Sequence, residues 1–374
     1  MTTSHQSHTP AAEEHFDLII IGTGSGNSIP SPDFDDRRIA IIEKGTFGGT
    51  CLNVGCIPTK MYVYAADIAL AAREAGRLGL DAQVNSVDWD SIVDRVFTNR
   101  IDQIAQGGEQ YRRGEETPNI TVYDEHARFI GPNTIQTGNH VISGDQIVIA
   151  AGSRPVIPEV YATSGVKYYT NEDIMRMDHQ PESLIVVGGG YIACEFATIL
   201  TGLGCETVQV YRGDAVLRGF DRQMRDMATL QLSGIGIDLR LNVNLTRLER
   251  TGDQTRVTFS DDSHEDFDAV IWATGRDPYT GGLGLENTGV HLRANGAIQV
   301  DEWSQTSVPS IFAVGDVTDR VNLTPVAIRE GHAFADTMFG NHPRHVDHAI
   351  VASAVYTRPH ELASVGLTEE KAKA

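Results

Sequence analysis

Short apolar runs that end in glycine recur along the chain, and they predict buried parallel strands. The first run, Phe16-Asp-Leu-Ile-Ile-Ile21, leads directly into a glycine-rich stretch over residues 22–27. A second run over residues 38–43 ends in Glu43, which lies 21 positions after Gly22. A strand, a glycine-rich turn and an acid about 20 residues later form the pattern of a dinucleotide-binding unit, in which the acid binds ribose hydroxyls.

The crossover between these two strands departs from the common pattern. Its third motif position holds Asn27 rather than glycine or alanine, and Pro30 and Pro32 follow shortly after. Because proline cannot sustain a full helix, we expect a stunted first helix and an irregular loop up to about residue 36.

A second dinucleotide-binding unit starts at residue 184. The apolar stretch 184–187 runs into Gly188-Gly-Gly-Tyr-Ile-Ala193, a helical pattern continues through Leu203, and a strand follows over 207–211. This copy satisfies the G-x-G-x-x-G/A pattern in full and repeats the first copy in all but detail. Two such units predict an α/β fold with two Rossmann-like dinucleotide-binding domains.

Other segments complete this outline. Apolar residues at helical spacing predict helices over 61–78 and 90–112, and short strands follow between 120 and 149. A last strand over 310–316 precedes a helix through Phe339 that carries Pro325 in its first turn.

Composition narrows the class of protein. The 374 residues predict two or more domains, and 50 acidic against 30 basic side chains give a net charge of −20. This balance argues against nucleic acid or an anionic membrane surface as a partner, because both need a positive field. No apolar run approaches the roughly 20 residues of a membrane span. Residues 1–15 lack the apolar core of a signal peptide and are expected to form a disordered tail.

The cysteines carry the sharpest chemical signal. Only Cys51, Cys56, Cys194 and Cys205 occur, which indicates a reducing cytoplasmic compartment rather than a secreted disulfide scaffold. The first two lie in the segment Gly48-Gly-Thr-Cys-Leu-Asn-Val-Gly-Cys-Ile-Pro-Thr-Lys60. The other two flank an apolar helix, and we expect them to be inert core residues.

A disulfide between Cys51 and Cys56 would restrict the local backbone. Five residues of regular helix rise about 7.5 Å, which exceeds the roughly 7 Å between Cα atoms that a disulfide allows. A bridged pair therefore excludes regular helix throughout the segment, and Gly55 supplies the necessary freedom. A helix N-terminus lowers the pKa of a thiol and favours a thiolate after reduction. The alternatives are two buried core thiols or a zinc site, which is less favoured because no second Cys or His pair lies at ligand spacing.

These motifs resemble the flavoprotein disulfide reductases, a family that includes glutathione reductase, lipoamide dehydrogenase and mercuric reductase. Segments 22–29 and 43–51 are most similar to the mycothione reductases of actinobacteria, and the resemblance spans residues 16–372. It implies FAD at the first dinucleotide unit and a nicotinamide dinucleotide at the second. By the same resemblance, Cys56 faces the flavin as a thiolate and Cys51 attacks the disulfide substrate, while Lys60 lies near flavin N5 and pairs with Glu195.

The glycine motifs, the residues that follow the strand over 207–211 and the resemblance together predict the cofactor contacts. For FAD they are Gly22, Gly24, Ser25, Gly26, Glu43, Lys44, Gly49, Thr50, Lys60, Ala127, Gly152, Asp316 and Thr324. For NADPH they are Gly188, Gly190, Tyr191, Ile192, Glu195, Arg212, Arg218 and Gly275, with the Tyr191 ring covering the nicotinamide pocket. No metal site is expected.

The end of the strand over 207–211 indicates which nicotinamide cofactor binds. An NAD enzyme would place Asp or Glu there to hold the ribose 2′-hydroxyl. Here Arg212 follows, with Arg218 six positions later, and guanidiniums can bind a 2′-phosphate bidentately, which favours NADPH. The alternative is that both are solvated loop arginines, and Asp214 between them is a contrary sign.

The resemblance divides the chain into an N-terminal tail (1–15), an FAD-binding domain (16–155 and 276–344), an NADPH-binding domain (156–275) and the start of a truncated dimerisation domain (345–374). The family's catalytic base, a His followed five positions later by Glu, is matched only by His8 and Glu13 in the tail. We therefore expect this chain to bind FAD poorly, to turn over little and to dimerise weakly, whereas full-length relatives are homodimers.

The resulting expectation is an NADPH- and FAD-dependent enzyme that reduces a small-molecule disulfide, mycothione, and serves thiol redox homeostasis. Within the family, the alternatives are a glutathione reductase-like enzyme and lipoamide dehydrogenase, which Arg212 and Arg218 oppose. The alternative from a different class is an inactive flavin-binding fragment.

Overall fold

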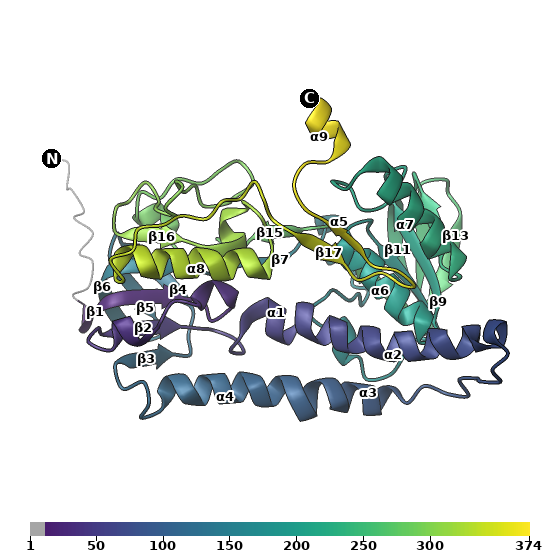
Figure 1. The fold of residues 1–374 in the computed structure, drawn as a ribbon, viewed down its shortest axis with the longest axis horizontal. Coiled ribbons are helices and arrows are strands. Elements are labelled where there is room, and N and C mark those ends of the chain that lie inside the picture. The colour runs from purple at the N-terminus through teal and green to yellow at the C-terminus, as the bar shows by residue number, and fades with distance from the viewer. Residues whose placement is uncertain (1–11) are drawn as a thin grey trace. The chain divides into compact units, whose positions relative to one another are not determined.

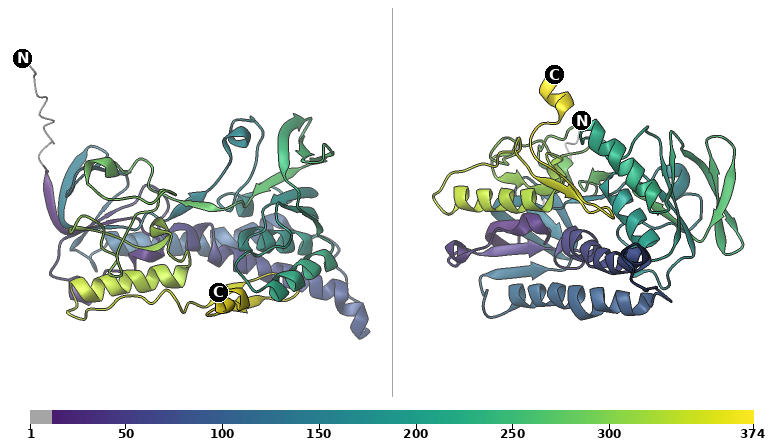
Figure 2. Two further views of the ribbon diagram at one scale, coloured as in Figure 1. Left: turned by 90° about the horizontal axis from the view of Figure 1, so that it is seen from above. Right: turned by 45° about the vertical axis from the view of Figure 1, so that its right-hand side comes forward.

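The computed structural model describes residues 12–374, which belong to two compact units (Figures 1 and 2). Of the described residues, unit 1 comprises 12–51, Ile104–Arg154 and Asp277–His348, and unit 2 comprises Leu52–Gln103, Pro155–Arg276 and Ala349–Ala374. Most of the predicted tail, residues 1–11, lies outside the described residues.

Unit 1 is built on a seven-stranded sheet with the order β3-β2-β1-β6-β5-β4, in which β16 also pairs with β6. Strands β1, β2, β3 and β16 run parallel to their partners, as the two apolar runs predicted. The strands are β1 (Glu14–Ile21), β2 (Ile39–Ile42), β3 (Ile120–Tyr123), β4 (Ala127–Gly131), β5 (Thr134–Thr137), β6 (His140–Ile149) and β16 (Ile311–Ala313). Strand β1 begins inside the range predicted as the tail, because Glu14 and His15 pair with β6.

Both faces of this sheet are buried, which explains why its strands are continuous apolar runs. Leu18 and Ile20 face the side covered by α8 (Thr324–Met338), where they join a cluster with Phe334 (Figure 1). Ile19 and Ile21 point to the opposite side and join a cluster with Phe129 of β4. The period-2 alternation of a strand thus supplies side chains to two separate cores.

The crossover after β1 is short, as predicted. Only two 3₁₀ turns, η1 (Ser25–Asn27) and η2 (Pro32–Phe34), lie between β1 and β2. The Asn27 side-chain amide donates a hydrogen bond to the Gly22 carbonyl at 3.0 Å, so Asn27 ties the glycine turn together. A Cβ atom at Gly331 of α8 would lie 2.7 Å from the Gly26 oxygen, so the long helix packs at backbone distance on the short turn.

Unit 2 contains a four-stranded parallel sheet with the order β10-β9-β8-β14. Its strand β8 alternates in the same way, with Leu184 and Val186 on a face covered by helices and Ile185 and Val187 against a three-stranded antiparallel sheet (Figure 2). The parallel strands are β8 (Ser183–Val187), β9 (Glu206–Tyr211), β10 (Asp238–Leu241) and β14 (Ala269–Trp272), and the antiparallel ones are β11 (Leu245–Thr251), β12 (Gln254–Phe259) and β13 (His264–Phe267).

The helices of unit 2 include one that starts earlier than the apolar pattern predicted. Helix α2 begins at Cys56 instead of residue 61, because Pro58 is tolerated in a first turn. Segment 90–112 is helical but is interrupted by a π-turn at Phe97–Ile101. The helices are α2 (Cys56–Glu74), α3 (Trp89–Val96), α6 (Tyr191–Gly202) and α7 (Arg222–Gly234), and α4 (Asp102–Arg113) leads back into unit 1.

The compact units do not coincide with the predicted domain ranges. Residues 52–103 fall within the predicted range 16–155, but they pack in unit 2 because Tyr62 and Ala66 of α2 join the core formed by α6. The remaining short elements are α1 (Gly49–Asn53), η3 (Ala75–Leu78), β7 (Ser153–Pro155), α5 (Glu159–Ala162), η5 (Ile174–Arg176), β15 (Arg276–Pro278), η6 (Leu285–Asn287), η7 (Gly315–Thr318), β17 (Ser353–Val355), β18 (Leu362–Ser364) and α9 (Glu369–Lys373).

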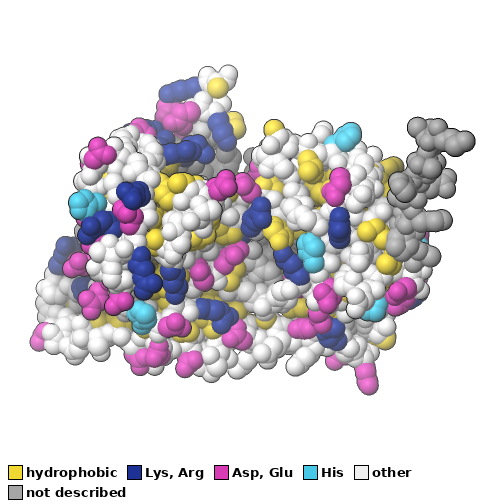
Figure 3. Space-filling view, turned by 180° about the vertical axis from the view of Figure 1, so that it is seen from behind, with side chains coloured by type: hydrophobic (Ala, Val, Ile, Leu, Met, Phe, Trp, Pro, Cys, Tyr) yellow, Lys and Arg dark blue, Asp and Glu magenta, His cyan; other side chains and the backbone are white. Residues whose placement is uncertain are grey.

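The surface carries charges of both signs. On the face drawn in Figure 3, Lys and Arg side chains lie interspersed with Asp and Glu side chains. Among residues 12–374, no helix is both long enough and apolar enough to cross a membrane.

Candidate functional site

Four residues predicted to contact FAD follow strands that end at one edge of the unit 1 sheet. Ile21 at the end of β1 pairs with Ile42 of β2 and with Ile149 of β6, and Ala313 of β16 pairs with Ile149 as well. Carboxyl ends of parallel strands that change order at one point are where open α/β sheets bind ligands. The predicted FAD residues that come shortly after these strand ends in the sequence are Gly22, Glu43, Gly152 and Asp316.

The backbone at this edge fits a dinucleotide. Gly22 has φ +105°, and a Cβ atom there would lie 2.5 Å from the Ala150 oxygen. Gly49 has φ +62°, and its Cβ would lie 2.5 Å from the Gly24 Cα, so two glycine-rich segments touch without side chains. A Cβ at Gly152, in contrast, would meet nothing within 4 Å. The chain therefore packs tightly beneath an edge that stays open at Gly152, as the close approach of FAD requires.

Glu43 is fixed in place by its neighbours. Its Oε2 accepts hydrogen bonds from the Thr23 amide (3.0 Å) and the Thr23 hydroxyl (2.8 Å), and its Oε1 accepts one from the Gly45 amide (2.9 Å). A carboxylate oxygen has two lone pairs, so Oε1 can accept a further bond from a ribose hydroxyl. The role of Thr23 was not predicted, although its place inside the glycine motif was the available signal.

Asp316 is positioned by two groups that the sequence analysis missed. The Ser153 hydroxyl donates to Asp316 Oδ2 at 2.7 Å. The preceding amide, that of Gly315, donates to Glu330 Oε2 at 2.6 Å. Glu330 is only 2% exposed, and its Oε1 also contacts Arg320 (2.9 Å) and His348 (2.6 Å). Burial lowers the pKa of Arg320, and the Glu330 carboxylate counteracts that effect.

The other predicted FAD contacts are divided between the units. Lys44 lies with its Nζ 4.1 Å from the centre of the Tyr279 ring, and Thr324 is the first residue of α8. Lys60 is in unit 2. The remaining predicted contacts, all in unit 1, are Gly24, Ser25, Gly26, Gly49, Thr50 and Ala127.

The predicted NADPH residues gather at the matching edge of the unit 2 sheet. Val187 at the end of β8 pairs with Val210 of β9 and with Trp272 of β14, so the loops after these strands share one edge. These loops contain Gly188, Gly190, Arg212 and Gly275, with Tyr191 and Ile192 in the first turn of α6.

The turn before α6 has the shape of a phosphate cradle. Gly188 has φ +147°, and a Cβ there would lie 2.2 Å from the Ala273 oxygen. A Cβ at Gly190 would meet nothing within 4 Å, and Gly190 caps α6 without any side-chain hydrogen bond. The amides of the first turn of a helix attract a pyrophosphate, so this cradle fits a dinucleotide. Tyr191, the predicted cover of the pocket, is 44% exposed.

The arginines after β9 fall into two groups. Arg222 Nη1 lies 2.5 Å from Asp214 Oδ2, and Arg225 Nη2 lies 3.6 Å from Asp214 Oδ1. Hydrogen bonding to Arg222 lowers the pKa of Asp214, and this carboxylate is therefore already paired with two arginines of α7. Arg212 and Arg218 are exposed, and no ion pair is found for either among the described residues. These two guanidiniums are therefore available for a 2′-phosphate.

The ring of Tyr211, the last residue of β9, lies between two glycines. A Cβ at Gly189 would lie 2.4 Å from the Tyr211 Cγ, and a Cβ at Gly213 would lie 2.5 Å from its Cε1. Glycine is therefore required on both sides of the ring. The Tyr211 side chain thus lies at the end of β9 and beside the glycine turn that contains Gly189.

Lys60 and Glu195, predicted to act as a pair, lie together in unit 2. Lys60 Nζ is 3.9 Å from Glu195 Oε2, with the lysine side chain 32% exposed and the glutamate side chain 7% exposed. Burial raises the pKa of Glu195, while Lys60, the Tyr356 amide and Arg358 partly offset that rise. Helices α2 and α6 bring the two residues together, because a Cβ at Gly202 would lie 2.9 Å from the Ala66 Cβ.

Cys51 and Cys56 lie on opposite sides of a break between two helices. Cys51 is in α1, which ends at Asn53, and Cys56 is the first residue of α2. Gly55 has φ −143° and ψ −121°, so the segment is not regular helix throughout, as a bridged pair requires. Both cysteines are half-buried.

Cys194 and Cys205 contrast with this pair. Both are buried, at 0% and 5% exposed, which confirms that they are core residues. Burial raises the pKa of Cys194 to about 12 and that of Cys205 to about 11, so neither forms a thiolate at neutral pH.

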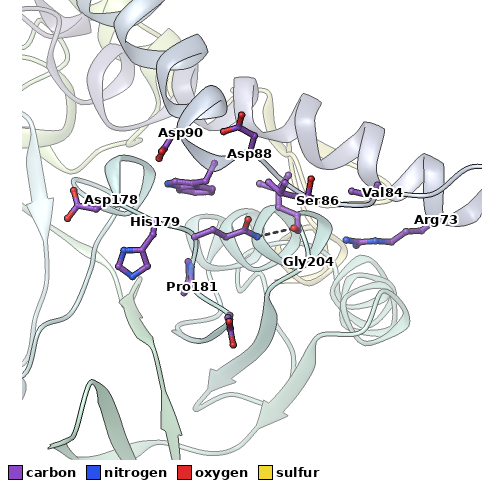
Figure 4. A pocket seen from close by; sticks show the side chains of 14 residues that line it. Arg73, Val84, Ser86, Asp88, Asp90, Asp178, His179, Pro181 and Gly204 are labelled. Carbon is purple, nitrogen blue, oxygen red and sulfur yellow. Dashed lines mark hydrogen bonds between the residues drawn. The ribbon is translucent and has the colours of Figure 1, made fainter.

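Unit 2 contains a cavity of about 610 Å³, whose lining side chains include Arg73, Asp88 and His179 (Figure 4). Its wall includes Asp88, which caps α3 by accepting from the Ser91 amide at 3.0 Å, and Gln180, which donates to the Leu203 oxygen at 2.9 Å. None of its 14 lining residues is a predicted site residue.

Known proteins resemble this chain over most of its length. The family model described as "Pyridine nucleotide-disulphide oxidoreductase" matches residues 16–331. A glutathione reductase of Burkholderia cepacia is 42% identical over 360 residues, which cover 96% of this chain and 79% of that protein. A mycothione reductase of Mycobacterium tuberculosis is 41% identical over 374 residues, which cover 96% of this chain and 80% of that protein. The HOCl-induced flavoprotein disulfide reductase RclA from Escherichia coli superposes with a TM-score of 0.85 at 28% identity, covering 96% of this chain and 79% of that one. The predicted α/β fold with Rossmann-like dinucleotide-binding domains is thereby confirmed.

Proposed function

The chain belongs to the pyridine nucleotide-disulphide oxidoreductases, and on this premise we propose that it reduces a low-molecular-weight thiol disulfide with NADPH through a Cys51–Cys56 disulfide. It is a disulfide oxidoreductase, and its cofactors are FAD and NAD(P)H. The observation that carries the proposal is the helix break at Gly55, which leaves two half-buried cysteines on consecutive helices.

The chemistry of the pair follows from thiol exchange. FAD held at the unit 1 edge by residues such as Gly22, Glu43 and Asp316 would supply two-electron redox chemistry between the nicotinamide and the disulfide, which leaves Cys51 and Cys56 as a reduced pair. The Cys51 thiolate then attacks one sulfur of the substrate disulfide, releases one thiol and leaves a mixed disulfide. Cys56 attacks the Cys51 sulfur, releases the second thiol and restores the bridge. The balance is one NADPH and one proton consumed for two thiols formed.

Lys60 and Glu195 act beside the bridge in this proposal. The 3.9 Å contact between Lys60 Nζ and Glu195 Oε2 supports a role in which the carboxylate keeps the ammonium oriented. By resemblance, Lys60 would be one of the residues that hold the flavin, and a positive charge there would favour the reduced ring.

NADPH rather than NADH is the proposed donor. Arg212 and Arg218 support this choice, because Asp214 is committed to Arg222 and does not compete for the ribose. A guanidinium binds a phosphate more strongly than it binds a hydroxyl, so the 2′-phosphate adds affinity.

Mycothione is the proposed substrate, and glutathione disulfide is the alternative. A mycothione reductase at 41% identity supports the first, and a glutathione reductase at 42% identity supports the second. Turnover with each disulfide at equal concentration would choose between them, since a specific enzyme should differ in kcat/KM by at least about tenfold.

The test of the proposal is anaerobic reduction of the FAD-loaded protein by NADPH. We expect a long-wavelength thiolate–flavin absorption band that is lost in Cys56→Ser and kept in Cys51→Ser, while both variants lose turnover. Cys205→Ala is the matched control, because that thiol is buried and should leave the band unchanged. A reduced protein without the band, or a band that survives in Cys56→Ser, would show that the dithiol assignment is wrong.

A further inference from the structure

We propose that Tyr356 is a positioning residue for Lys60, a role that rests on the function proposed above for Lys60. The Lys60 Nζ lies 4.1 Å from the centre of the Tyr356 ring and 3.9 Å from Glu195 Oε2. The ammonium is therefore held between a carboxylate and an aromatic face. Attraction of a cation to a ring at this distance is a recognised stabilising contact.

Tyr356 reaches the same pair through its backbone. Its amide donates a hydrogen bond to Glu195 Oε1 at 2.9 Å, so one residue contacts both the carboxylate and the lysine. Each oxygen of Glu195 then has its own partner, the Tyr356 amide on Oε1 and Lys60 on Oε2. Because the amide bond does not depend on the side chain, replacing the ring leaves Glu195 satisfied.

The segment that carries Tyr356 is anchored on both sides. Val355 and Leu362, each 2% exposed, pair across β17 and β18 and join the main core of unit 2. Arg358, 6% exposed, forms an ion pair with Asp67 of α2 and another with Glu361. Since Asp67 lies on the same helix as Lys60, this segment fixes the ring relative to the lysine.

The Lys60 side chain needs such a restraint because a lysine has several rotatable bonds. With 32% of its side chain exposed, Lys60 could turn toward water if only Glu195 held it. The ring blocks that movement and keeps the ammonium over one place. In the proposed function, the Lys60 ammonium can favour the reduced flavin only while it stays in one position.

The experiment compares Tyr356→Leu with Tyr356→Phe in the FAD-loaded protein. The leucine removes the ring and keeps an apolar side chain, whereas the phenylalanine keeps the ring and removes only the hydroxyl. The first readout is the rate at which an amine-acylating reagent modifies Lys60, measured by peptide mass spectrometry. The second is the rate of flavin reduction by NADPH in a stopped-flow instrument.

We expect Lys60 to react about two- to fivefold faster in Tyr356→Leu, with wild-type reactivity in Tyr356→Phe. Flavin reduction should slow by a similar factor in the leucine variant alone. Unchanged acylation in Tyr356→Leu, or equal acylation in the two variants, overturns the proposal. Faster acylation with an unchanged flavin reduction rate overturns its functional part.

The labelling readout separates this inference from the proposed function. If the dithiol assignment fails, the thiolate–flavin band is missing, but Lys60 acylation still responds to Tyr356→Leu. If this inference fails, acylation does not respond, although the band is present. Acylation of Lys371 on exposed α9 serves as the internal reference in both cases.

Discussion

Replacing both Arg212 and Arg218 by alanine should weaken binding of the 2′-phosphorylated nucleotide and leave the unphosphorylated one unaffected. Both side chains are exposed, and no ion pair is found for either within residues 12–374. The substitutions therefore remove charge without breaking a contact on which the fold depends. Any loss of affinity reports the missing bond to the ligand.

The size of the effect follows from the exposure of the two arginines. A hydrogen bond to a charged group contributes about 1.5–3 kcal/mol, and solvent screening places these exposed groups at the lower end. Each arginine then accounts for about a tenfold change in Kd, and the pair for about 100-fold if the two act independently. Increasing the salt from about 0.05 M to 0.5 M should reduce the effect, because both charges lie in water.

Calorimetry with adenosine 2′,5′-bisphosphate measures this difference without turnover. Adenosine 5′-monophosphate is the matched ligand, and its Kd should change by less than about threefold. Arg247→Ala is the control variant, because Arg247 forms only an exposed pair with Glu249 at 2.7 Å in the same unit. A double variant that binds the bisphosphate as tightly as the wild type would refute the assignment of these arginines.

Three further predictions concern stability. Gly202→Val should lower the free energy of unfolding by about 1–3 kcal/mol, because a Cβ there would lie 2.9 Å from the Ala66 Cβ. Gly76→Ala is the control and should not lower it, because a Cβ at Gly76 would meet nothing within 4 Å. Equal urea midpoints for the two variants would contradict this prediction. Burial raises the pKa of Glu195, so the folded state binds the proton of this carboxyl more tightly than the unfolded state does. The stability that this proton contributes is present below the ordinary pKa of 4.5 and is lost as the pH rises through the pKa of the folded state. Relative to Glu195→Gln, the wild type should therefore lose stability between pH 4 and pH 8 in urea titrations, and a constant difference would argue against it. Glu330→Gln should cost about 2–4 kcal/mol and reduce FAD retention on a desalting column, because the half-buried Arg320 loses its carboxylate partner. Full retention of FAD would disprove the link from Glu330 to Asp316.

Local sequence was sufficient where one segment determines its own structure. The strand and glycine turn at 16–27 and the turn at 188–190 form as predicted, because the required residues are neighbours in the chain. The prolines after Asn27 gave the short crossover for the same reason, since they act on the backbone next to them.

Contacts between distant segments could not be read in the same way. The Tyr356 ring meets Lys60 across almost 300 positions, and the Glu330 carboxylate meets the Gly315 amide through tertiary packing alone. The grouping of residues 52–103 with the second unit was also missed, because it depends on which core Tyr62 enters. The pattern of one segment contains no information about such partners.

The position of the Tyr211 ring limits how the coenzyme preference of this protein could be redesigned. The usual exchange, an acid introduced where the strand ends, would remove the ring that lies between Gly189 and Gly213 and leave a gap beneath the phosphate turn. An acid introduced at Gly213 would instead collide with that ring. Engineering toward NADH is therefore best directed at Arg212 and Arg218, which are exposed and for which no ion pair is found among the described residues.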